Sequence, residues 1–120
     1  QAKAALVAKN PKETAVLLKG KQASTQGISV GKLSKDQQAL VGQTIKSVLS
    51  PYRAEDVDEA MKVLEAGGGL EKLHMSFYTA EDLNNDKVWD VWRLEGPTFV
   101  SYFRGAPHVH DYINVGLKNV

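Results

Sequence analysis

The residues best suited to chemistry are the histidines, and all three lie in the C-terminal half of the 120-residue chain. Two of them, His108 and His110, are separated by a single residue. If this stretch forms a strand, both side chains point to the same face, so two imidazoles can meet on one ligand. Imidazole favours zinc or copper. The pair therefore predicts a transition-metal site, with His74 or a carboxylate such as Glu95 as the third protein ligand.

A structural role for the same pair is an alternative. Two histidines on a strand also organise a sheet when they hydrogen-bond to the backbone or to side chains such as Asp111 and Tyr102. Two neighbouring histidines are a far less specific signal than a four-ligand zinc pattern. Three protein ligands and a bound water would suit hydrolytic or redox chemistry, but no nucleophile and base stand in a recognised arrangement. Whether the chain is an enzyme therefore stays open.

A second set of residues predicts a binding surface. Tyrosine, tryptophan and arginine are enriched at interaction hot spots. Strand alternation places five such polar or aromatic residues on one sheet face, namely Arg93, Glu95, Tyr102, Arg104 and Tyr112. The charged members also fit an exposed ion-pair ladder, worth at most about 1 kcal/mol per pair. We favour a binding or assembly module that meets another protein chain or the rest of its own precursor.

The elements that position these residues change in type along the chain, and residues 1–67 are predicted to be mainly helical. Residues 2–9 are rich in alanine and lysine, and Asn10 and Pro11 then resemble the start of a helix over residues 14–19. Residues 20–33 have loop composition, with an apolar alternation at Ile28 and Val30 that fits a connector along the core.

Two amphipathic helices follow. Ser34 and Gln37 form a capping box ahead of a helix that ends before Pro51, with an apolar stripe that begins at Leu40. A further helix starts at about Glu55 and ends at the glycines of positions 67–69.

Residues 70–120 are predicted to be mainly strand. Residues 73–78 alternate between apolar and polar, and residues 88–115 fit a three-stranded meander. Turns of two and three residues would place Glu95 opposite Thr98 and Arg104 opposite His108. The expected fold is α+β, a single domain of residues 1–120 in which the helices pack on one face of an antiparallel sheet.

Composition excludes several classes of partner. The chain has 15 basic and 14 acidic residues and a net charge of +1, so it has no electrostatic footprint for nucleic acid. No apolar run approaches the roughly 20 residues that span a bilayer, so membrane insertion is not expected. Cysteine is absent, which excludes disulfides, thiolate catalysis and thiolate metal ligands.

Two motifs carry a family resemblance. Residues 89–97 (WDVWRLEGP) and 103–110 (FRGAPHVH), supported by similarity over most of the chain from about residue 20, resemble the C-terminal part of an uncharacterised bacterial family, the domain of unknown function 3500 type. Its members are often predicted secreted proteins, notably in planctomycetes. The resemblance implies a secreted or periplasmic protein after signal removal, and a larger precursor, in keeping with a chain that starts at Gln1. It implies no activity. The family's histidine strand matches His108 and His110, and an earlier histidine falls near His74.

Overall fold

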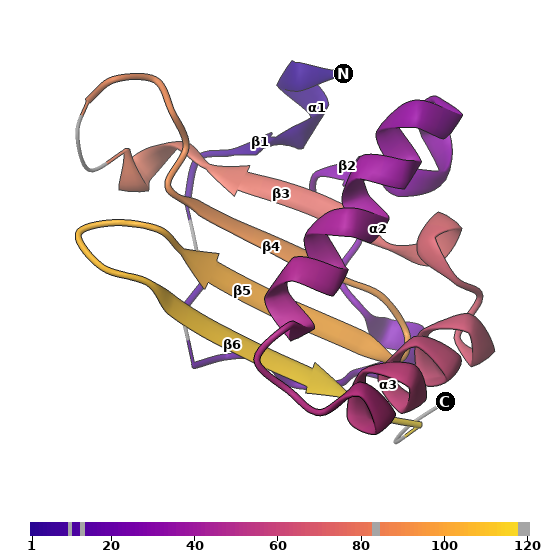
Figure 1. Cartoon of the computed structure of the whole chain (residues 1–120). Coiled ribbons are helices and arrows are strands. Elements are labelled where there is room, and N and C mark those ends of the chain that lie inside the picture. Colours follow the sequence, from indigo (N-terminus) through magenta and orange to yellow (C-terminus); the bar gives the residue numbers. More distant parts are fainter. Residues whose placement is uncertain (10, 13, 83–84, 118–120) are drawn as a thin grey trace.

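Four consecutive strands form the framework of the molecule, and two helices pack across one face of them (Figure 1). The computed structural model describes residues 1–9, 11–12, 14–82 and 85–117. The strands β3 (His74–Tyr78), β4 (Val91–Glu95), β5 (Phe99–Arg104) and β6 (His110–Val115) pair in order and antiparallel. The helices are α2 (Lys35–Leu49) and α3 (Ala54–Ala66). The predicted α+β fold is confirmed.

Two short strands extend the sheet beyond β3. The strand β1 (Leu6–Val7) pairs parallel to β3, and β2 (Ile28–Ser29) pairs antiparallel to it. Their registers place β1 beside the end of β3 and β2 beside its beginning, so both share one edge of that strand. The sheet is therefore six-stranded and mixed, and neither short strand was predicted from the sequence.

The hairpin registers differ from the prediction by two residues each. Glu95 lies opposite Val100 rather than Thr98, and Arg104 lies opposite His110 rather than His108. The first loop covers residues 96–98 rather than 96–97, and the second covers residues 105–109 rather than 105–107, which places His108 in the second turn. Because side chains alternate with a period of two, this error leaves every strand residue on its predicted face.

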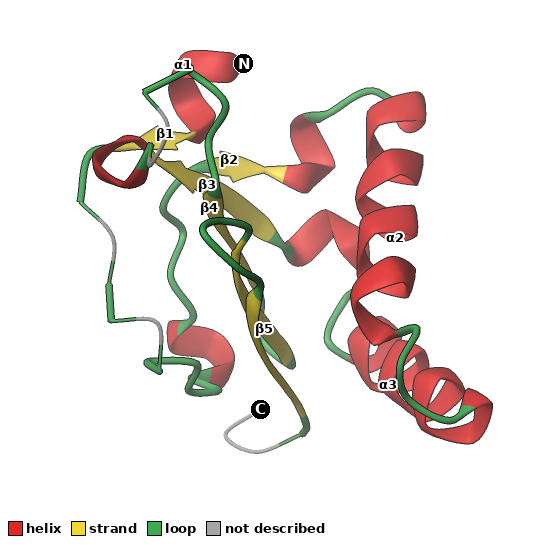
Figure 2. Ribbon diagram, turned by 60° about the vertical axis from the view of Figure 1, so that its left-hand side comes forward, coloured by secondary structure: helices red, strands yellow, loops and turns green. Residues whose placement is uncertain are grey.

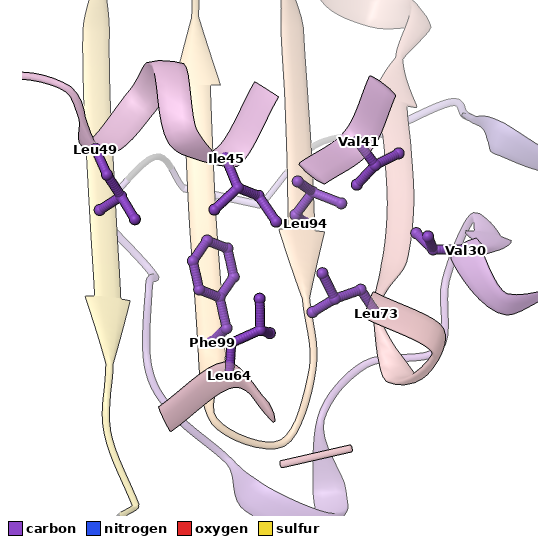
Figure 3. Close-up of a cluster of buried hydrophobic side chains, with 8 residues drawn as sticks. All are labelled: Val30, Val41, Ile45, Leu49, Leu64, Leu73, Leu94 and Phe99. Atoms are coloured by element: carbon purple, nitrogen blue, oxygen red, sulfur yellow. The ribbon is translucent and has the colours of Figure 1, made fainter. Parts of the chain in front are cut away.

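The core lies between the sheet and the helices. Ser34 caps α2 through the predicted capping box, with its Oγ accepting from the Gln37 amide at 3.2 Å. Figure 3 shows the packed side chains, which are Val30, Val41, Ile45, Leu49, Leu64, Leu73, Leu94 and Phe99. Leu40 was predicted on this inner stripe but is 61% exposed. Residues 41, 45 and 49 repeat every four positions, and Leu40 falls to one side of that narrow row.

The N-terminal region departs most from the prediction. The helix α1 covers only Ala2–Ala5, and the described residues of 14–19 form no helix. Asn10, part of the predicted helix start, lies outside the described residues. The chain instead runs across the sheet face opposite α2 and α3 (Figure 2), with one turn of 3-10 helix at Gly20–Gln22. We call residues 11–26, of which residue 13 is not described, the covering segment.

Burial explains why this segment is not helical. Val16 packs against a cluster of Tyr78, Val91 and Tyr102 on the sheet. Helix propensity amounts to only tenths of a kcal/mol per residue, so contacts with a buried aromatic surface override it. Within the described part of the chain, no helix is long and apolar enough to cross a membrane.

Candidate ligand-binding cavity

The polar face of the sheet, which the sequence predicts as a binding surface, is buried beneath the covering segment. Tyr78 and Tyr102 stack with ring centroids 6.1 Å apart, and they are 1% and 2% exposed. Asn114 on β6 donates from Nδ2 to the carbonyl of Val16 at 3.2 Å, which holds the segment against the far side of the sheet. The part of this face around Tyr78 and Tyr102 is therefore an internal interface rather than an open surface.

A cavity remains beside the tyrosines. It has a volume of about 200 Å³ and lies between the covering segment and strands β3 and β4. Its lining is mostly polar, and it consists of Pro11, Lys19, Ser24 and Gln26 from the segment and His74, Ser76, Tyr78, Arg93 and Glu95 from the sheet. The register explains the sheet side, because His74 lies opposite Glu95 and Ser76 opposite Arg93.

A buried ion pair forms one wall of the cavity. Arg93 and Glu95 stand two apart on β4, so both side chains point to this face. Nε of Arg93 donates to Oε1 of Glu95 at 2.9 Å, and the Ser24 amide donates to Oε2 at 2.8 Å. The two residues are only 8% and 4% exposed. Both oxygens of Glu95 are thus engaged, and the carboxylate ties the covering segment to the sheet.

The guanidinium of Arg93 is incompletely satisfied. Its Nη1 is buried and has no hydrogen-bond partner among the described residues. A buried donor without an acceptor costs about 1–3 kcal/mol, and more when it belongs to a charged group. Such a group in a native structure calls for an explanation, and an acceptor from outside the chain is one.

Apart from Lys19, the remaining described lining groups are neutral near pH 7. Burial raises the pKa of Tyr78 to about 12, so its hydroxyl stays protonated. Burial, and secondarily the charge of Lys32, lowers the pKa of His74, which favours the neutral imidazole. The Ser76 hydroxyl donates to the carbonyl of Gln26 at 3.1 Å. The cavity therefore presents polar groups while keeping few charges.

The predicted histidine site assembles only in part. The rings of His108 and His110 lie with centroids 4.6 Å apart at 60°. His74 lies on β3, three strands away from His110 on β6, and the register places it four residues further along the sheet. The two histidines are therefore separated by about 14 Å across the strands and about 13 Å along them. Glu95, opposite His74 on β4, lies two strands from His110, about 10 Å across the sheet and about 13 Å along it. In the part of the chain that the structure describes, no three His, Asp or Glu side chains gather to hold a metal ion.

The structure likewise brings together only some of the five residues predicted for binding. Arg93 and Glu95 line the cavity, and Tyr102 packs beside it. Tyr112 packs against the same aromatic cluster. Arg104 lies at the other end of the sheet, where its Nε donates to the carbonyl of Ala106 at 3.0 Å.

Comparison with known proteins yields no relative. No protein-family model matches the chain, and neither the curated proteins nor the solved structures provide a match. The resemblance carried by residues 89–97 and 103–110, and the secreted origin that it implies, therefore stay predictions.

Proposed function

We propose that the chain is a ligand-binding module whose site is the cavity under the covering segment. The observation that carries the proposal is Nη1 of Arg93, a buried cationic donor on a cavity-lining residue with no partner among the described residues. The covering segment already occupies the sheet face on which the sequence predicted a protein partner. A small molecule held between the segment and the sheet fits this arrangement better than a second protein.

The size of the cavity limits the ligand. At about 30 Å³ per molecule of liquid water, about 200 Å³ corresponds to roughly seven waters. Typical pockets for drug-sized ligands span about 300–1,000 Å³. The ligand is therefore small, on the order of ten non-hydrogen atoms or fewer.

The hydrogen bonds across the cavity support an entry route. Hydrogen bonds join the sheet to the backbone of the covering segment at the Ser24 amide and at the carbonyls of Gln26 and Val16. Segments outside helices and strands open locally at a lower free energy than core strands do. Separation of the segment from the sheet therefore gives a small molecule access to Arg93.

An NMR titration tests the proposal. Isotope-labelled chain is titrated with acetate, acetamide, ethylammonium and glycerol, which differ in charge and hydrogen-bonding character. We expect at least one probe to shift the amide signals of Ser24, Gln26 and Ser76 saturably. The variant His74→Trp places a large side chain in the cavity wall and abolishes these shifts. His110→Trp changes another partly buried histidine on the same sheet face, outside the cavity, and leaves them intact.

Two results would contradict the proposal. One is the absence of a saturable shift at these amides with all four probes. The other is a set of shifts that persists unchanged in a folded His74→Trp variant, because binding would then occur elsewhere.

A further inference from the structure

The charges around the cavity are unequal. Among the described lining residues, Arg93 and Lys19 are cationic and Glu95 is anionic, which leaves one net positive charge. Lys19 is exposed at the rim, whereas the ion pair is buried. The buried ion pair thus forms one wall of the site, and the second cation belongs to the exposed part of its lining.

Glu95 does not compete for the donor that remains. Its Oε1 accepts from Nε of Arg93 and its Oε2 from the Ser24 amide. A ligand that accepts from Nη1 leaves both of these hydrogen bonds in place. Among the described residues Nη1 has no acceptor, and an oxygen that carries negative charge would be its strongest partner, since charge-assisted hydrogen bonds from arginine are the strong ones.

We infer that the ligand is a small monocarboxylate, an inference that rests on the ligand-binding function proposed above. One negative charge balances the one net positive charge of the lining. A carboxylate also matches the geometry in which guanidinium groups bind planar oxyanions.

Phosphate fits the same donor less well. A phosphate monoester carries about −1.5 to −2 charges at pH 7, which exceeds the net charge of the lining and adds repulsion from Glu95. Phosphate sites commonly use a row of backbone amides at a glycine-rich loop or helix start. The described lining of this cavity instead comes from strands β3 and β4 and from four residues of the covering segment.

The test compares dissociation constants for acetate, acetamide, ethylammonium and inorganic phosphate at pH 7 and fixed ionic strength, using the same amide signals. Acetate and acetamide have nearly the same shape and differ in charge. We expect acetate to bind at least about tenfold more tightly than acetamide, because the hydrogen bond from Nη1 becomes charge-assisted. We also expect it to bind more tightly than phosphate and ethylammonium.

Variants connect the binding to named groups. Lys19→Met removes the rim cation and lowers acetate affinity by roughly two- to fivefold, the range for an exposed charge. Lys21→Met is the matched control, because Lys21 is an exposed lysine of the same segment that does not line this cavity. The double variant Arg93→Met with Glu95→Met removes donor and counter-charge together, which avoids an isolated buried charge. It loses the preference for acetate over acetamide.

The possible failures are distinct. If no probe binds at the cavity, both the ligand-binding function and the carboxylate inference are wrong. If acetamide or ethylammonium binds as tightly as acetate, the function stands and the carboxylate inference is wrong. Tighter binding of phosphate would also overturn it, in favour of a phosphate ligand. If the folded double variant still prefers acetate over acetamide, Nη1 of Arg93 does not bind the ligand.

Discussion

The ion pair of Arg93 and Glu95 is poorly explained by stability alone. Burying two charges costs several kcal/mol per ion, and apolar residues of similar volume often serve as well or better. Both side chains are at most 10% exposed. A ligand-binding role for the Arg93 guanidinium, with the Glu95 carboxylate anchoring the covering segment, would explain why both charges are buried here.

Removing one partner of the pair should therefore cost far more than removing both. We expect Arg93→Met to destabilise the fold by about 3–5 kcal/mol, because Glu95 is left as a buried charge without its counter-ion. The double variant with Glu95→Met is expected to lie within about 1–2 kcal/mol of the parent chain. Urea unfolding measures both. A single-variant loss below about 1 kcal/mol would mean that the pair behaves as an exposed one.

Tyr78 makes stability depend on alkaline pH. Its pKa is raised to about 12 by burial, against 10.0 for an ordinary tyrosine. The folded state thus holds its proton more tightly than the unfolded state, so this stabilisation is fully present below pH 10 and is lost as pH rises through about 12. The expected loss is about 2–3 kcal/mol.

The alkaline effect is measured by urea unfolding at a series of pH values between neutral and strongly alkaline. Tyr78→Phe provides the comparison, because it lacks the ionising hydroxyl and keeps the ring. The stability of the parent chain relative to Tyr78→Phe should fall as pH rises from about 10 through about 12. Parallel stability curves for both chains would show that Tyr78 ionises in the folded state as easily as in the unfolded one.

His108 and His110 lie together without a third ligand among the described residues. Two imidazoles hold a metal ion less firmly than the three or four protein ligands of zinc sites. We expect protein made without a histidine tag to retain far less than one zinc or copper per chain after dialysis, as measured by plasma mass spectrometry. One retained metal per chain that disappears in His108→Ala with His110→Ala would instead support the metal site predicted from the sequence.

At the scale of elements, Gly27 joins the covering segment to β2. Its φ is +83°, and a Cβ at this position would overlap the backbone carbonyl of Met75 on β3. Gly27→Ala should therefore cost about 2 kcal/mol or more, from backbone strain and displacement of the segment. Gly42 is the control, because it lies within α2 and an added Cβ would make an ordinary 3.5 Å contact with Leu70.

The two glycine variants should shift stability in opposite directions. Gly42→Ala is expected to stabilise by about 0.5–1 kcal/mol, since alanine loses less backbone entropy within a helix. Thermal or urea unfolding of both variants measures the difference. An unchanged stability in Gly27→Ala would mean that the segment does not approach β3 as closely as the structure has it.

The elements predicted correctly are those with strong local signals. The capping box at Ser34 and the glycines at 67–69 bound α2 and α3, and alternation identified the faces of β3 to β6. Residues 14–19 of the covering segment were mispredicted as helix because their conformation follows from burial against Tyr78 and Tyr102, which no local pattern encodes. The strands β1 and β2 have two residues each, too few for a periodic signal.

The sequence predicts the sheet side of the cavity but not the side formed by the covering segment. Alternation placed Arg93 and Glu95 on one polar face, and the same reasoning places Ser76 and Tyr78 on the matching face of β3. The other wall comes from the covering segment, where Ser24 meets Glu95 across 71 residues and Gln26 meets Ser76 across 50. Contacts of such separation depend on the route of the whole chain, so the cavity itself could not be predicted.

At the scale of the whole molecule, the sheet is covered on both faces by different means. The helices α2 and α3 lie over one face and the covering segment over the other (Figure 2). The helices bury an apolar core, and the segment packs over tyrosines, an ion pair and a cavity. The apolar side supplies stability, because burial of apolar surface is the dominant favourable term in folding. The proposed binding site lies on the polar side.

A crystal structure of the whole chain, grown without carboxylates and then soaked in acetate, tests the ligand cavity most directly. We predict an ordered carboxylate beneath the covering segment, with one oxygen about 3 Å from Nη1 of Arg93 and the pairing of Nε with Glu95 retained. A cavity closed by the segment's own side chains, or one from which acetate is absent while Nη1 bonds to the protein, would contradict the proposed function.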